Sequence, residues 1–198
     1  MAWKRNKKDF ADFKPDVNPS TWIKTVRLTQ LQRLRLAKWG GYIGMMVLGL
    51  VLQDTIMSQF RLFGATTDLA VMVIMLITVL EGSEVGSVFV LAASLFYYFS
   101  GSAPGAYCVV LMSFLGIAAT MLRQMYWHRS KGSVLLCAAL ALMGYEIGLF
   151  VVGILSELTW AGRIGSFFMT GVYSSLLMIP LYPLIYKIGL IGGNTWKE

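Results

Sequence analysis

Charged residues are scarce in this sequence: 14% of its 198 residues are Asp, Glu, Lys or Arg, while 57% are hydrophobic. A soluble domain carries about a quarter charged residues, which help to cover its surface. The shortage therefore excludes an ordinary water-soluble domain and indicates a chain that lies in lipid. The length allows one compact membrane domain.

Cysteine and histidine are also rare, which removes most metal and redox chemistry. Cys108 and Cys137 fall within apolar runs at no metal-binding or redox spacing, and His128 is the single histidine. The sequence contains no nucleophile elbow, no phosphate-binding glycine-rich loop and no Glu-x-x-His pair. We therefore expect neither a cofactor nor an enzymatic activity.

The stretch from Thr67 to Gly105 sets the architecture that we expect for the whole chain. It contains two apolar runs joined by a short turn at residues 81–86, and it ends in the turn-forming residues 100–105. Two apolar runs with so little chain between them must lie side by side as a hairpin. In lipid, each run can satisfy its own backbone polar groups only as a helix.

Similar apolar runs recur along the chain and predict an all-α polytopic membrane protein with six transmembrane helices. A helix needs about 20 apolar residues to cross ~30 Å of hydrocarbon. The second and third runs are shorter, so they either cross a thin bilayer or form a re-entrant hairpin. Both readings keep the number of crossings even. The six segments cover approximately residues 39–56, 69–80, 86–99, 104–122, 133–155 and 166–188.

Basic residues gather in the first 38 positions, which hold ten of the seventeen Lys and Arg residues. The positive-inside rule places this end in the cytoplasm. With an even number of crossings the other terminus lies there too, and only Arg61 and Arg163 face outward. We therefore expect a basic cytoplasmic tail over residues 1–38, a transmembrane domain over 39–190 and a short cytoplasmic tail over 191–198.

Residues 22–38 of this tail are predicted to form a helix that lies along the membrane surface. At 100° per residue, four of its basic side chains share a sector about 80° wide and would face anionic lipid headgroups. These four residues are Lys24, Arg27, Arg35 and Lys38. A plain topology signal and a nucleic-acid-binding arm are the alternatives. Because the run adjoins a span, we expect lipid and not nucleic acid to be its partner.

Glu146 is the strongest candidate for a functional site, because it lies near the middle of the fifth segment. Insertion scales assign a central carboxylate a cost of about 3 kcal/mol. It must therefore face the bundle interior or a partner. A structural hydrogen bond between helices and a partner, ligand or proton site are equally open. No second acid or base is expected at its depth.

Asp54 and Asp68 bracket the first outer loop, which also contains Arg61. Asp68 is expected to cap the helix that follows it, where its charge also complements the helix dipole. Asp54 is a candidate to pair with Arg61 or with another protein. Glu81 and Glu84 are expected to form a solvated acidic turn.

Several turns and apolar runs occur in a fixed order between roughly residues 45 and 188. They are Leu52-Gln53-Asp54, the run from Leu62 to Leu69, Glu81-Gly82 with Gly86, the turn from Ser100 to Gly105, and Tyr173 to Leu177 followed by Pro180, Leu181 and Tyr182. In this order they resemble the MreD family of rod shape-determining membrane proteins of bacteria. The chain departs from the family at Thr67, where proline is usual, and at Tyr97, where aspartate is usual.

The resemblance implies a non-enzymatic scaffold in the bacterial cell membrane, within the complex that directs cell elongation, rod shape and peptidoglycan synthesis. It implies an MreC-like membrane protein as partner, together with MreB filaments and peptidoglycan synthases. The family is also similar in fold to the six-helix substrate-binding component of energy-coupling-factor vitamin transporters, which supplies an alternative function. A pocket of convergent polar groups that opens to the outside would favour that alternative.

Overall fold

A computed structural model describes residues 30–57, 66–126 and 130–191 of the chain. These residues form helices and no strand, which confirms the predicted all-α class. The elements are α2 (Gln30–Leu52), a short π-helical turn η1 (Gln53–Met57), α3 (Leu69–Glu81), α4 (Ser83–Phe99), α5 (Tyr107–Tyr126), α6 (Lys131–Leu155), a 3-10 turn η2 (Ala161–Arg163) and α7 (Ile164–Gly189).

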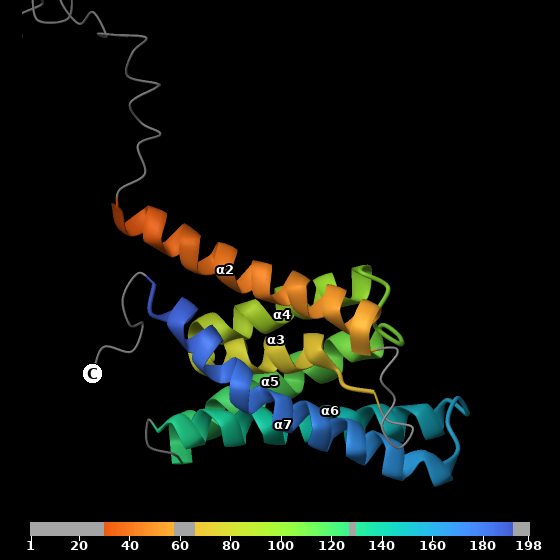
Figure 1. The fold of residues 1–198 in the computed structure, drawn as a ribbon. Coiled ribbons are helices and arrows are strands. Elements are labelled where there is room, and N and C mark those ends of the chain that lie inside the picture. Colours follow the sequence, from red (N-terminus) through yellow and green to blue (C-terminus); the bar gives the residue numbers. More distant parts are fainter. Residues whose placement is uncertain (1–29, 58–65, 127–129, 192–198) are drawn as a thin grey trace, which may run out of the picture.

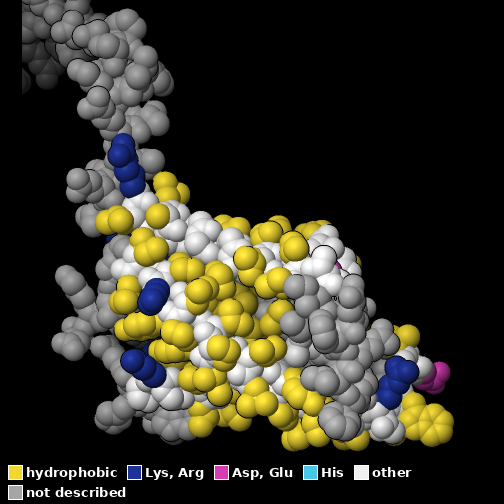
Figure 2. All heavy atoms as spheres, in the orientation of Figure 1, with side chains coloured by type: hydrophobic (Ala, Val, Ile, Leu, Met, Phe, Trp, Pro, Cys, Tyr) yellow, Lys and Arg dark blue, Asp and Glu magenta, His cyan; other side chains and the backbone are white. Residues whose placement is uncertain are grey.

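Four of the described helices, α2, α5, α6 and α7, are long and apolar enough to cross a membrane. Their outward faces carry large exposed apolar side chains such as Leu48, Phe114, Leu140 and Leu176. Figure 2 shows that apolar side chains dominate the middle of the visible face of the bundle. An apolar surface of this extent is unfavourable in water and favourable against lipid tails. These properties indicate a membrane protein.

Helix α3 forms the centre of the bundle, and all 13 of its residues are buried. It contacts α2, α4, α5, α6 and α7, and it lies between α2 and the α6–α7 pair in Figure 1. Its sequence is apolar on every side apart from Thr78 and the terminal Glu81, as expected of a helix enclosed by others. At 1.5 Å per residue it is roughly 20 Å long, which is shorter than a bilayer core.

Helices α3 and α4 form the predicted hairpin, with Gly82 alone between them. Gly82 has a φ of 85°, a backbone conformation that glycine adopts without strain. Its N–H donates to the Thr78 carbonyl oxygen at 3.2 Å and so ends α3. Helix α4 has 17 residues and also falls short of the usual spanning length. Both short lengths agree with the sequence reading.

The other helix boundaries follow the prediction closely, except at the start of α2. Helices α5, α6 and α7 begin or end within a few residues of the expected segments. Helix α2, however, begins at Gln30, so residues 30–38 are its first turns and continue directly into the apolar part. The rest of the expected surface helix, including Lys24 and Arg27, lies outside the described residues. Arg35 is exposed on α2.

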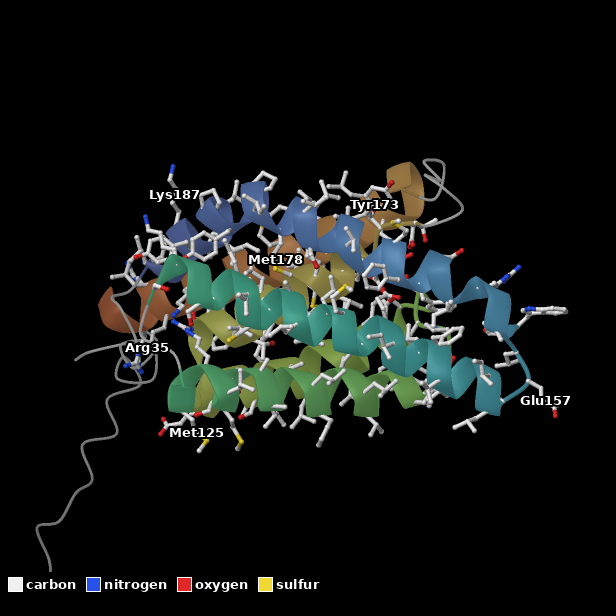
Figure 3. The ribbon with its side chains drawn as sticks, turned by 90° about the horizontal axis from the view of Figure 1, so that it is seen from below. Arg35, Met125, Glu157, Tyr173, Met178 and Lys187 are labelled. Carbon is white, nitrogen blue, oxygen red and sulfur yellow. The ribbon has the colours of Figure 1, made fainter. Side chains whose placement is uncertain are left out.

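The described basic residues separate by position along the bundle. Figure 3 shows Arg35, Met125 and Lys187 at one end, and Glu157 at the other. We call the first the basic end and the second the Arg163 end, because Arg163 immediately precedes α7 there. The basic end carries Arg33, Arg35, Lys38, Arg123, Lys131 and Lys187, which lie in the terminal parts of α2, α5, α6 and α7.

A buried ion pair at the basic end corrects the expectation for Glu81. Its side chain is not part of a solvated turn: the Lys38 Nζ lies 2.7 Å from one carboxylate oxygen and 2.8 Å from the other. The Tyr42 hydroxyl also donates to Glu81. Lys38 is correspondingly buried and does not face headgroups, because Glu81 ends the buried helix α3 beside it. Glu84, one turn later, is exposed as expected.

Candidate functional site: a polar cavity at the Arg163 end

A cavity of about 560 Å³ opens among the helix ends at the Arg163 end of the bundle. Several segments that are distant in the sequence contribute to it, namely η1, the residues before α3, the end of α4, the middle of α6 and the start of α7. Its polar lining includes Gln53, Thr67, Asp68, Tyr97, Glu146 and Arg163. The remainder of the protein interior is largely apolar.

Asp68 holds the start of α3 in place beside this cavity. One carboxylate oxygen accepts a hydrogen bond from the Val71 N–H at 3.2 Å, which confirms the predicted N-cap. Its own backbone N–H donates to the Ser174 hydroxyl on α7 at 2.9 Å. Burial raises the pKa of the Asp68 carboxyl group, since desolvation disfavours the charged form.

Residues from three separate segments meet around this cap. The Gln53 side-chain oxygen accepts from the Ala70 N–H at 2.9 Å, and so satisfies a second backbone donor at the start of α3. The Tyr97 hydroxyl lies 3.4 Å from an Asp68 oxygen and 3.4 Å from the Ser102 carbonyl oxygen. The Ser102 hydroxyl donates to Asp54 at 3.3 Å. These contacts tie η1, α3 and the α4–α5 connection together.

Glu146 reaches the same cavity from α6. Its side chain is only 3% exposed, and within the described part of the chain one of its carboxylate oxygens has no hydrogen-bond partner. The Thr67 hydroxyl is also buried without a hydrogen-bond partner among the described residues. Gly171 on α7 lies against this part of α6, because a Cβ there would lie 2.5 Å from the Met143 Sδ and in ordinary contact, at 3.5 Å, with the Glu146 Cγ. A buried carboxylate that lacks a full set of partners is unusual and costly.

The structure brings two of the sequence candidates together and separates others. Asp68 and Glu146 line one cavity, although the sequence analysis identified no second acid near Glu146. Helix α3 is short and packs against α6, so its N-terminal cap lies at the same cavity as a carboxylate of α6. Asp54 accepts a hydrogen bond from Ser102, which lines the cavity. Arg61 lies outside the described residues.

Sequence reasoning missed Gln53 and Tyr97 as parts of this site. In the sequence, Gln53 was noted only as part of the Leu52-Gln53-Asp54 motif. Tyr97 was noted only as a departure from the family pattern. Their spacing along the chain gave no sign that both side chains contact the first turn of α3. The only available signal was a polar residue near the end of each of two apolar segments, the first and the third.

The cavity does not have the composition of a metal site. Within the described part of the chain, no three His, Cys, Asp or Glu side chains group closely enough to hold an ion. Two carboxylates, an amide, a phenol and a threonine hydroxyl instead offer hydrogen bonds to a polar ligand. No protein-family model, curated protein or solved structure matches this chain.

Proposed function

We propose that this chain is a non-enzymatic membrane scaffold of the bacterial cell-elongation complex, related to the MreD family. The observation that carries the proposal is that residues of the resemblance gather at one point of the fold. Gln53, Asp68 and Ser102 come from three of its separate motifs, and they belong to one set of hydrogen-bonded contacts around the first turn of α3. A motif order that encodes a shared fold should produce this convergence.

The proposal includes six crossings, with both termini in the cytoplasm. Helices α3 and α4 are then the second and third crossings, and the bilayer or the surrounding helices accommodate their shortness. The support for this orientation is the distribution of charge. The basic end of the bundle holds most of the described Lys and Arg side chains, and such an excess marks the cytoplasmic side of membrane proteins.

Site-directed labelling tests the orientation. We expect a Glu157→Cys variant to react with a membrane-impermeant maleimide on intact cells, because Glu157 is exposed at the Arg163 end. Glu84 is exposed in the first turn of α4, and a matched Glu84→Cys variant should react only after the cells are permeabilised. Cys108 and Cys137 are buried and should contribute little background. The reversed labelling pattern would invert the topology and remove the proposed partners.

Isolation of the protein from mild detergent tests the scaffold role. We expect a tagged chain expressed in a rod-shaped bacterium to recover a single-span, MreC-like protein in stoichiometric amount, as judged by mass spectrometry. The expected contacts are the exposed apolar helix faces and the polar end of the bundle. Cells carrying the untagged chain serve as the control. Recovery of the tagged chain without any such partner would contradict the proposal.

The second candidate function is that of a substrate-binding subunit of an energy-coupling-factor transporter. The observation that favours it is the cavity itself, whose polar side chains converge from several helices at the end proposed to face outward. This function requires a transport engine as partner. The same isolation distinguishes the two, since a transporter subunit would recover ATPase-linked subunits or a bound vitamin.

A further inference from the structure

The cavity at the Arg163 end has two acidic side chains, Asp68 and Glu146, in its lining. Glu146 is almost completely buried, and Asp68 lines the same cavity. Arg163 is the basic side chain of the described lining, but it is exposed to solvent. The buried part of the cavity therefore offers two acids without a buried basic residue among the described lining residues.

The unpaired oxygen of Glu146 indicates that the cavity accepts a donor from elsewhere. Buried carboxylates normally accept several hydrogen bonds, and leaving one oxygen without any is unfavourable. The Thr67 hydroxyl, which belongs to the same lining, also has no hydrogen-bond partner among the described residues. A ligand that carries N–H donors and positive charge would satisfy both groups, and charge-assisted hydrogen bonds are the strong ones.

The volume of the cavity indicates how large such a ligand can be. About 560 Å³ is far more than a dehydrated metal ion fills, and the described residues supply no third metal-binding side chain. Cavities of several hundred cubic ångströms typically hold organic groups of several non-hydrogen atoms. The lining also contains apolar side chains, from Pro104, Leu149 and Phe167, against which an alkyl chain can pack.

We infer that this cavity binds an organic cation, a primary ammonium on an alkyl chain, with the charged nitrogen against Glu146 and Asp68 and the chain along the apolar part of the lining. Two sources offer this group: a lysine side chain of a protein segment, or a free small amine. The inference stands on the cavity alone and does not require the scaffold function. It assigns Glu146 to ligand binding and Asp68 to both ligand binding and helix capping.

Binding to the purified full-length protein in mild detergent tests this inference. The probes are n-butylammonium, Nα-acetyl-lysine amide and the neutral analogue Nα-acetyl-norleucine amide, each titrated calorimetrically and by thermal unfolding. We expect both ammonium probes to bind saturably and to raise the unfolding temperature, because a ligand that binds only the folded state stabilises it. The norleucine probe should bind at least tenfold more weakly than the lysine probe.

The two ammonium probes distinguish the sources. Tighter binding of Nα-acetyl-lysine amide than of n-butylammonium would show that the site also contacts the peptide groups beside the side chain. Such contacts are expected if the natural ligand is a lysine of a protein segment. Equal or tighter binding of n-butylammonium would point to a free amine. Both outcomes support a site for an organic cation.

Two variants locate the site, and a third is their control. Glu146→Gln should weaken the ammonium probes by about tenfold or more, because the charge of the acceptor is lost. Thr170→Met, which fills the cavity from α7 and keeps both acids, should weaken them as well. Glu157→Gln removes an exposed acid at the same end and should leave binding unchanged. If Glu146→Gln does not fold, the affinity of the Thr170→Met variant for the ammonium probes tests the location of the site.

Three results would overturn the inference. They are the absence of saturable ammonium binding, equal binding of the lysine and norleucine probes, and unchanged ammonium binding in a folded Glu146→Gln or Thr170→Met variant. Any of these would assign Glu146 to the packing of α6 against α7. Recovery of an MreC-like partner would remain unaffected, so failure here is distinct from failure of the scaffold proposal.

Discussion

Gly86→Ala should push α4 away from α3 and strongly destabilise the folded protein. A Cβ at residue 86 would lie 2.3 Å from the Thr78 carbonyl oxygen and 3.1 Å from the Thr78 carbonyl carbon. Both are backbone atoms in the last turn of the buried helix α3, so relief requires a backbone shift of α3 or α4. Overpacking of a well-packed interior costs about 1–3 kcal/mol and occasionally more, and we expect the upper end of that range.

Thermal unfolding in detergent, monitored by fluorescence-detected size exclusion, measures this effect. Gly44→Ala is the matched control, because a Cβ at residue 44 on α2 meets nothing within 4 Å. That substitution should be neutral or slightly stabilising, since alanine favours a helix more than glycine does. Equal unfolding temperatures for the two variants would mean that the hairpin is more loosely packed than described.

Lys38→Met should be the second strongly destabilising substitution. It removes the cation that lies 2.7 Å from the buried Glu81 carboxylate and leaves that negative charge in the protein interior. Breaking a buried pair from one side typically costs about 3–5 kcal/mol. Arg35→Met is the control on the same helix, because Arg35 is exposed and its loss should change stability little.

The double variant Lys38→Met with Glu81→Gln separates pairing from packing. Removing both charges should recover a large part of the stability lost in Lys38→Met, because the buried carboxylate that lost its lysine is also gone. The Tyr42 hydroxyl can still donate to the amide oxygen of the new side chain. Additive losses in the double variant would show that the two charged groups are not energetically coupled.

Helices that meet lipid could be predicted well from the sequence, whereas the identity of the central helix could not. Segments such as Lys131–Leu155 carry enough apolar residues to fix their own limits. The sequence also showed that residues 69–81 form a short apolar helix beside α4. It did not show that five other helices surround this one, because burial against protein and burial against lipid select the same side chains.

The contacts of individual charged residues were predictable only where they are local. Asp68 caps the helix that it precedes, and sequence position alone is sufficient for that assignment. Glu81 and Lys38 are 43 residues apart, and their pairing depends on how α2 packs against α3. The joint site of Asp68 and Glu146 depends in the same way on the packing of α3 against α6. Such distant pairs leave no periodic signal.

The complete enclosure of α3 has a consequence for biosynthesis. Helix α7 is the last described helix to leave the ribosome, and until it is in place one side of α3 has no protein neighbour. Lipid must cover that side in the meantime. The side chains of α3 permit this, since its interior polar residue, Thr78, donates its hydroxyl to the carbonyl oxygen of Ile74 at 2.7 Å. A nascent chain that stops before Ile164 should therefore stay inserted but incomplete, and become a substrate for membrane proteases.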